Sequence, residues 1–132
     1  MQPQFALVDI GRLRPHERTQ PRLLAKVLDE IRGTGYVRRA LLVELEHLVI
    51  LDGHHRYEAL LRLGCVRAPA FLVDYKDDGI GLTTWPDATV KSVTKAEVVD
   101  RGLRGDPFPP KTTRHLVGFD LEDIRIPLDD LR

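Results

Sequence analysis

The chain has 132 residues, of which 42% are hydrophobic and 30% are charged. This length and this composition are typical of one soluble globular domain and exclude an intrinsically disordered chain. Twenty Lys and Arg residues balance twenty Asp and Glu residues, so the formal net charge is zero. A protein that grips nucleic acid regardless of its sequence needs a basic excess, and we therefore do not expect DNA as a partner.

The cysteine content and the apolar runs indicate where the protein works. Cys65 is the single cysteine. It excludes an internal disulfide framework and a cysteine-based metal cluster, and it suits a reducing compartment. No apolar run approaches the roughly 18 residues of a membrane span, and the first residues lack the pattern of a signal peptide. We therefore expect a cytoplasmic protein with no membrane partner.

The first third of the chain predicts a strand followed by a helix. Phe5 to Ile10 alternates loosely between apolar and polar residues, as a strand does. Pro21 suits the first position of a helix. Apolar residues then fall on one face of this helix, which we expect to end at Gly33 and Gly35.

The middle of the chain predicts strands on either side of a second helix. The apolar run before Asp52 is continuous, which is typical of a strand buried on both faces. Gly53 breaks this run, and His54 to Leu63 follows with helical spacing up to Gly64. The predicted strands of this region are Ala40 to Glu46, Leu48 to Asp52, Ala68 to Tyr75 and, less regular, Ile80 to Trp85.

The last third predicts one helix and little other regular structure. Thr94 and Glu97 have the spacing of a capping box ahead of a helix that runs to about Leu103. We expect Lys111 to His115 to be a loop or a helix start, and Ile124 to Leu128 to be a final strand. Because strands and helices are interspersed, the expected fold class is α+β (mixed α/β) in a single domain.

The strongest local motif runs from Leu51 to Arg56 and has the sequence Leu-Asp-Gly-His-His-Arg. A buried strand ends here, Gly53 permits a tight turn and a helix begins. Backbone N–H groups at a helix start lack partners and carry partial positive charge, so they bind anions, most often phosphate. Arg56 can grip phosphate oxygens with two parallel hydrogen bonds. Asp52 could hold Mg²⁺ or orient a hydroxyl group.

The same motif also has an ordinary structural interpretation. Asp52 could simply cap the helix, and the two histidines could be solvated or bonded within the core. A zinc site is not favoured, because adjacent histidines on a helix point about 100° apart and no His-x-x-x-His spacing occurs. On local physics alone, a phosphate site and a plain strand–turn–helix junction both stay open.

Three further features have candidate chemistry. Lys111 to His115 places five donor-bearing side chains in succession, which suits carboxylate or phosphate recognition or else a basic solvated turn. Glu17 lies between cationic residues, where a surface salt bridge is the ordinary role. Trp85, the single tryptophan, could shape a pocket or fill a core or edge position.

Together these motifs resemble a known family. Residues 49–60, with Leu63-Gly64-Cys65 and Pro69 to Tyr75 after them, resemble the ParB/sulfiredoxin-like fold. Within this superfamily, Asp-Gly-His-His-Arg combined with the run from Phe108 to His115 is similar to the free L-serine kinases, which phosphorylate serine itself to O-phosphoserine with ATP or ADP. The resemblance covers nearly the whole chain.

The motif differs from those of other members of the superfamily. Sulfiredoxins carry their catalytic cysteine directly after the glycine, where this chain has His54. Chromosome-partitioning ParB proteins have Gly-Glu-Arg-Arg at this place and a helix-turn-helix domain further on, and the residues after Tyr75 show no convincing one. A sequence-specific DNA clamp is therefore not expected. A ParB-like nucleotide-binding regulator that transfers no phosphoryl group stays open as the alternative.

The resemblance implies a role for each matched residue. Glu17 would be the general base on the serine hydroxyl, and Asp52 would orient this hydroxyl or hold Mg²⁺ through the phosphates. The cofactor would be Mg²⁺ with ATP or ADP, and the partners would be this nucleotide and a small amino acid. Residues 1–132 would form a single domain, with a core over 1–75 and an extension over 76–132 that completes the pocket. The nucleotide phosphates would bind Gly53, His54, His55 and Arg56, and serine would bind Lys111, Thr112, Thr113, Arg114, His115 and Trp85.

Overall fold

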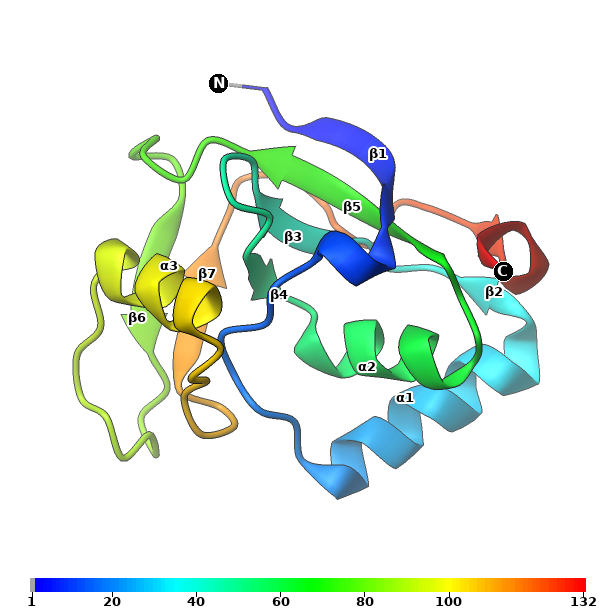
Figure 1. The fold of residues 1–132 in the computed structure, drawn as a ribbon, viewed down its shortest axis with the longest axis horizontal. Coiled ribbons are helices and arrows are strands. Elements are labelled where there is room, and N and C mark those ends of the chain that lie inside the picture. The colour runs from blue at the N-terminus through cyan, green and yellow to red at the C-terminus, as the bar shows by residue number, and fades with distance from the viewer. Residues whose placement is uncertain (1) are drawn as a thin grey trace.

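A four-stranded mixed sheet forms the centre of the fold in the computed structural model, which describes residues 2–132 (Figure 1). Its strand order is β1-β5-β3-β4. β5 pairs antiparallel with β1 and parallel with β3, and β3 pairs antiparallel with β4. The strands are β1 (Gln4–Asp9), β5 (Arg67–Val73), β3 (Leu41–Glu44) and β4 (Ile50–Asp52).

Two helices cover one face of this sheet and pack against each other, α1 (Pro21–Thr34) and α2 (His54–Arg62). Alternate residues of β3 divide between the two faces, so Leu41 and Val43 point into the core beneath these helices. Ile31 of α1 and Leu60 of α2 fill the same core. The start of α2 is thereby fixed directly after the buried strand β4.

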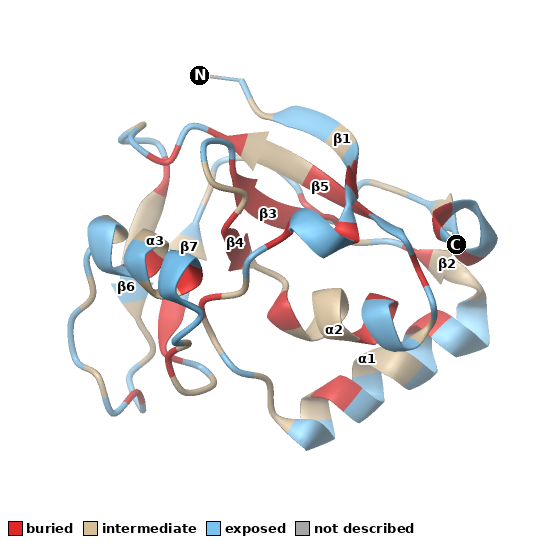
Figure 2. Cartoon of the chain, viewed as in Figure 1, coloured by how far each residue is buried: buried red, intermediate tan, exposed pale blue. Residues whose placement is uncertain are grey.

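A second apolar cluster covers the other face. Leu42 from β3, Leu51 from β4 and Val98 from α3 (Lys95–Arg104) meet there. The two-stranded antiparallel sheet of β6 (Gly81–Thr84) and β7 (Thr113–Leu116) lies beside α3 (Figure 1). Figure 2 shows buried residues in both layers, with β3 buried along its whole length.

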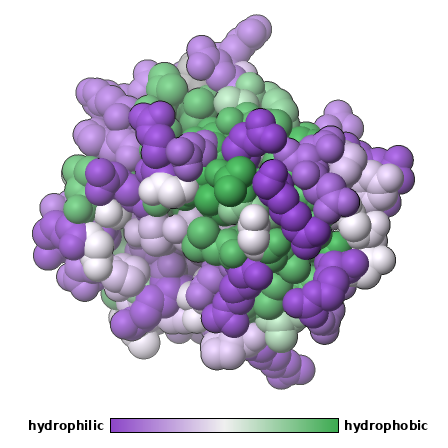
Figure 3. Space-filling model, turned by 45° about the vertical axis from the view of Figure 1, so that its right-hand side comes forward, coloured by the Kyte–Doolittle hydropathy of each residue, from purple (hydrophilic) through white to green (hydrophobic). Residues whose placement is uncertain are grey.

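Short elements complete the chain. β2 (Tyr36–Val37) pairs with β8 (Ile126–Pro127), and two 3₁₀ turns span Ile10–Arg12 and Leu128–Leu131. In the face drawn in Figure 3, apolar atoms show between hydrophilic side chains. None of the helices within residues 2–132 is both long and apolar enough to cross a membrane.

The structure confirms the α+β class and most of the predicted elements, and it corrects three details. Of the predicted loop or helix start at Lys111 to His115, only Lys111 and Thr112 lie in a loop, because residues from Thr113 onward form β7 and pair with β6. The predicted final strand is two residues long and continues as a 3₁₀ turn. Gly33 lies inside α1, and Gly35, with a left-handed φ of 75°, ends it.

Candidate active site

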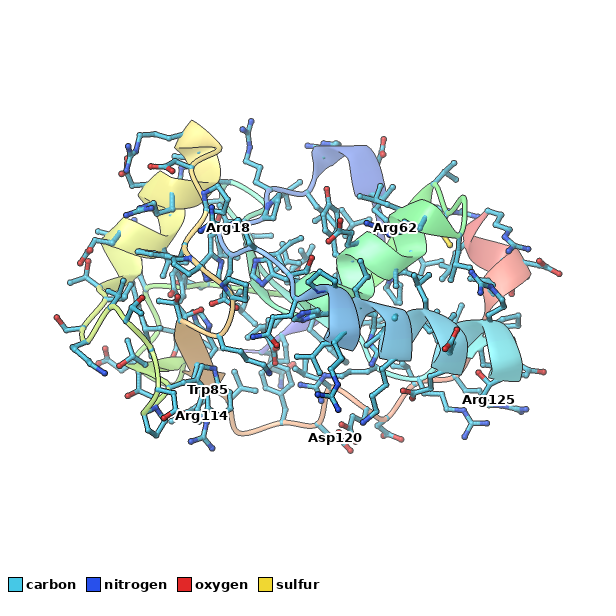
Figure 4. All side chains as sticks on the ribbon, turned by 90° about the horizontal axis from the view of Figure 1, so that it is seen from below. Arg18, Arg62, Trp85, Arg114, Asp120 and Arg125 are labelled. Carbon is cyan, nitrogen blue, oxygen red and sulfur yellow. The ribbon has the colours of Figure 1, made fainter. Side chains whose placement is uncertain are left out.

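Several segments that lie far apart in the sequence meet at one cavity of about 440 Å³. Residues 1–75 contribute Glu17 and the motif from Asp52 to Arg56, and residues 76–132 contribute Trp85 and the run around β7. Figure 4 shows Trp85 and Arg114 next to each other beside β7. The predicted site residues that line the cavity are Glu17, Asp52, Gly53, His54, His55, Arg56, Trp85, Lys111, Thr113, Arg114 and His115.

Thr112 is the exception among the predicted residues. Its side chain is buried, and its hydroxyl donates to the Pro109 carbonyl at 2.7 Å. Thr112 therefore contributes its backbone amide to the site, and its side chain holds the turn that precedes β7.

The loop that carries Glu17 is fixed on both sides by main-chain hydrogen bonds. Arg14 accepts from the Ile50 N–H at 2.9 Å, which ties the loop to β4. His16 accepts from the Phe108 N–H at 2.8 Å, and Arg18 donates to the Phe108 carbonyl at 2.9 Å. Glu17 thus lies between the central sheet and the approach to β7.

The carboxylate of Glu17 is bound by three successive main-chain amides. The N–H groups of Lys111, Thr112 and Thr113 donate to it at 3.2, 3.1 and 2.8 Å. Lys111 has a left-handed φ of 58°, a conformation that costs roughly 1–2 kcal/mol for a residue other than glycine. The surface salt bridge that local sequence favoured for Glu17 is wrong, because this carboxylate is half-buried and bound by amides.

Burial sets the proton affinity of Glu17. Loss of water raises the pKa of this carboxyl above its ordinary value, and the hydrogen bonds from the amides oppose that shift. A carboxylate with a raised pKa, held in a cavity, is a candidate for proton transfer.

The start of α2 is open toward an anion. Gly53 has a φ of 103°, and no side chain within residues 2–132 caps the helix. The first N–H groups of the helix therefore lack side-chain partners and carry its positive partial charge. Asp52 is not the cap that the ordinary interpretation expected, because its carboxylate accepts from the Arg39 guanidinium at 2.9 Å.

Two histidines of the motif attach the Glu17 loop to α2. Nε2 of His54 accepts the N–H of His16 at 3.1 Å, and Nε2 of His55 accepts the N–H of Gln20 at 2.9 Å. Each ring, when neutral, therefore carries its proton on Nδ1. Burial lowers the pKa of both rings, so near pH 7 both are neutral, and the positive charge of the site comes from its arginines and Lys111.

His16 is a functional candidate that the sequence did not single out. Its ring is fully buried, with Nδ1 2.6 Å from the Ile50 carbonyl oxygen and Nε2 2.8 Å from Oγ1 of Thr113. Burial lowers the pKa of His16 to about 4 and that of His115 to about 3. The one sequence signal for His16 is its place directly before Glu17. Its hydrogen-bond partners, Ile50 and Thr113, lie 34 and 97 residues further along the chain.

Arg39 is a second residue that the sequence did not indicate. It lines the cavity and pairs with both Asp52 at 2.9 Å and Glu122 at 2.8 Å. It precedes β3, and only the pairing of β3 with β4 brings it beside the motif. Its guanidinium adds a second arginine, beside Arg56, to the side of the cavity at the start of α2.

Trp85 forms a wall of the cavity. Its indole N–H donates to the Thr113 carbonyl at 3.0 Å, which fixes the ring. The guanidinium of Arg114 lies 4.9 Å and the ammonium of Lys111 5.3 Å from the ring centroid, both within the range of a cation–π contact. The ring therefore orients two cations that a small anionic ligand needs.

A larger cavity of about 770 Å³ lies between α3 and the turn after β3, and its lining contains none of the predicted site residues. Glu44, Glu46 and His47 gather at its edge. The buried Glu44 carboxylate already accepts N–H groups of Glu46, His47 and Val49 at 2.7 to 3.2 Å. This cluster therefore caps a turn, and the predicted site residues gather at the smaller cavity.

Comparisons with known proteins agree with the fold and with the motifs. No family model matches the chain. An ATP-dependent L-serine kinase of Staphylothermus marinus is 34% identical over 104 residues, which covers 74% of this chain and 41% of that protein. An ADP-dependent L-serine kinase of Thermococcus kodakarensis is 29% identical over 101 residues, with the same two coverages. A ParB-like protein of Sulfolobus acidocaldarius is 31% identical over 93 residues, 67% of this chain and 46% of that protein.

The structural likeness extends over nearly the whole chain. A free serine kinase in complex with AMP has a TM-score of 0.85 at 20% identity and matches 98% of this chain and 93% of that one. The fold is therefore that of the free serine kinases, a small mixed sheet flanked by helices. Sequence and structure together confirm the resemblance to the ParB/sulfiredoxin-like serine kinase family that the motifs indicate. The chain spans about two fifths of the length of the curated kinases that it matches.

Proposed function

We propose that this chain is a kinase that transfers a phosphoryl group from ATP or ADP to the hydroxyl of free L-serine. The observation that carries the proposal is the cavity in which Glu17, the open start of α2 and Arg114 meet. These features supply a base, a phosphate site and a cation for a carboxylate, which are the requirements of this reaction. The names of two relatives state L-serine as their substrate, one with ATP and one with ADP.

The nucleotide would bind at the start of α2. Its terminal phosphates would accept hydrogen bonds from the first N–H groups of the helix, with Arg56 and Arg39 on the equatorial oxygens. Asp52 is a hard oxygen donor at the same place, and one carboxylate with phosphate oxygens and water is a set that Mg²⁺ takes. Bound there, Mg²⁺ would neutralise charge on the transferred group.

Serine would bind between β7 and Glu17. The carboxylate of serine would pair with Arg114, and its amino group would face hydrogen-bond acceptors of the cavity. Trp85 would limit the space for amino acids with larger side chains. As the new bond between the serine oxygen and phosphorus forms, the bond to the nucleotide breaks and the hydroxyl proton passes to Glu17. The products are O-phosphoserine and a nucleotide with one phosphate fewer.

The domain organisation and the location of the protein belong to the same proposal. Residues 76–132 complete a pocket that residues 1–75 begin, because the lining comes from both parts, and we propose that they act as one domain. Cys65 is a buried free thiol, in keeping with work in the cytoplasm.

The test is phosphoserine formation by the purified chain with L-serine, Mg²⁺ and either ATP or ADP, followed by phosphorus NMR. Glu17→Gln should lose turnover and keep nucleotide binding, because the phosphate side of the cavity is unchanged. Glu46→Gln, a substitution of the same kind on an exposed turn, is the matched control and should keep full activity. Absence of phosphoserine with both donors, from folded protein, would contradict the proposal.

A nucleotide-binding regulator is the second candidate, and one observation favours it. The start of α2 offers a phosphate site that does not depend on Glu17, and one relative is named ParB-like. Tight nucleotide binding by calorimetry, together with no phosphoserine, would support this alternative. A gel shift with DNA that weakens steeply with salt would extend it to nucleic acid.

A further inference from the structure

A buried chain of polar groups leads from Glu17 into the core. Oε1 of Glu17 lies 3.1 Å from Oγ1 of Thr113, and this oxygen lies 2.8 Å from Nε2 of His16. Nδ1 of His16 lies 2.6 Å from the carbonyl oxygen of Ile50. All three spacings are within hydrogen-bond distance, so the positions of the protons can be derived from the partners at the buried end.

The Ile50 carbonyl fixes the tautomer of His16. A carbonyl oxygen only accepts, so Nδ1 of His16 must carry a proton. The ring is 0% exposed, and burial lowers its pKa to about 4, so the imidazole is neutral near pH 7. Nε2 therefore has a lone pair, and the hydroxyl of Thr113 must donate to it.

Because of this donation, no proton of Thr113 is left for its contact with Glu17. A hydroxyl has one proton, and that of Thr113 is directed at His16. When Glu17 is ionised, its Oε1 and Oγ1 of Thr113 face each other with lone pairs. When Glu17 is protonated, its own O–H donates to Thr113, and every contact from Glu17 to Ile50 becomes a proper hydrogen bond.

We propose that His16, acting through the hydroxyl of Thr113, is a positioning residue that favours the protonated form of Glu17. The network gains a complete set of hydrogen bonds when Glu17 takes up a proton, so it stabilises the state that follows proton removal from the acceptor hydroxyl. Its role in turnover rests on the proposed function, but its effect on Glu17 does not. Burial by itself also raises the pKa of Glu17.

The other titratable groups around this network do not supply the missing proton. His54 from α2 and His115 from β7 pack on His16 with ring centroids 4.6 and 5.9 Å away. The pKa of each is lowered by burial, so both are neutral near pH 7. Asp52 from β4 is the charged group that acts on His16, and it is paired with Arg39.

The first test uses the unaltered protein. Proton–nitrogen NMR of histidine-labelled chain reports which ring nitrogen carries the proton. We expect His16 to be neutral with its proton on Nδ1 across neutral pH. A neutral ring protonated on Nε2, or an imidazolium, would overturn the proposal, and this result needs no variant that must fold.

The second test follows Glu17 itself by carbon NMR of labelled glutamate during a pH titration. His16→Asn places its amide where Nδ1 lies and removes the acceptor for Thr113. The Thr113 hydroxyl then donates to Glu17 and stabilises its ionised form. Half-protonation of Glu17 should therefore need a proton concentration about threefold to tenfold higher, which is the effect of one hydrogen bond. His16→Gln keeps an acceptor near Nε2 and should stay close to the unaltered protein. No shift in His16→Asn, or an equal shift in both, would contradict the proposal.

Kinetics then connect the network to turnover. In His16→Asn we expect the acid limb of the pH–rate profile to move to lower pH and kcat to fall, with KM for the nucleotide unchanged. If the unaltered chain forms no phosphoserine, the proposed function fails while both NMR results still stand. If phosphoserine forms and Glu17 does not shift, only the role of His16 is wrong.

Discussion

Substitution of Gly53 by alanine is expected to damage both the fold and the phosphate site. Gly53 has a φ of 103°, and a Cβ atom there would lie 2.6 Å from Cδ2 of Leu41. Leu41 is fully buried in the core beneath the helices, so its side chain cannot swing aside without repacking its neighbours. The backbone at Gly53 must therefore shift, and the start of α2 with it.

Two independent terms set the magnitude. A left-handed φ costs a residue with a Cβ atom roughly 1–2 kcal/mol, and overpacking of a filled core costs typically 1–3 kcal/mol. We therefore expect Gly53→Ala to lower the free energy of unfolding by about 2–5 kcal/mol. Urea denaturation followed by circular dichroism measures this loss, and a fluorescent ADP analogue measures phosphate binding, which should weaken.

Gly64→Ala is the matched control. Gly64 also has a positive φ, of 80°, but a Cβ atom there would meet nothing within 4 Å. Gly64→Ala should lower the free energy of unfolding only by the cost of the left-handed backbone, roughly 1–2 kcal/mol. It should keep nucleotide binding. Equal losses in the two variants would refute the argument that Leu41 excludes a side chain at Gly53.

Three further predictions concern the core and the site. The pKa of His16 is about 4 in the folded chain against an ordinary 6.5, so the unfolded chain takes up this proton first. The free energy of unfolding should therefore fall as pH drops from 6.5 to 4, by about 3 kcal/mol for this group. Urea titrations that show no fall between these two pH values would contradict this prediction. Gly102→Ala should lower the melting temperature, because its Cβ would lie 2.7 Å from Val49, whereas Gly33→Ala in open space should raise it. Arg114→Ala should raise KM for serine at least tenfold with nucleotide binding unchanged; an equal loss of both would place Arg114 elsewhere in the reaction.

Local signals predicted the elements whose ends are encoded nearby. The capping box of Thr94 and Glu97 is present, and α3 starts where it indicates. The junction at Gly53 also lies where the buried run and the glycine placed it. Each of these features depends on residues a few positions apart, which is why one sequence was enough.

Features that depend on distant pairing could not be predicted in this way. β7 is a strand because β6, about thirty residues earlier, pairs with it. Arg39 has no local motif and reaches the cavity only through the sheet. The partners of His16 lie in β4 and β7, so its neighbour Glu17 could be assigned a role only through a family resemblance.

The three amides that bind Glu17 have a consequence for how the chain matures. They come from residues 94 to 96 positions further along the chain. Contacts of such long sequence separation form late, because a large loop must close first. A ribosome-bound chain that has not yet released β7 can therefore fold α1 and α2 while the Glu17 carboxylate still lacks the amides that hold it.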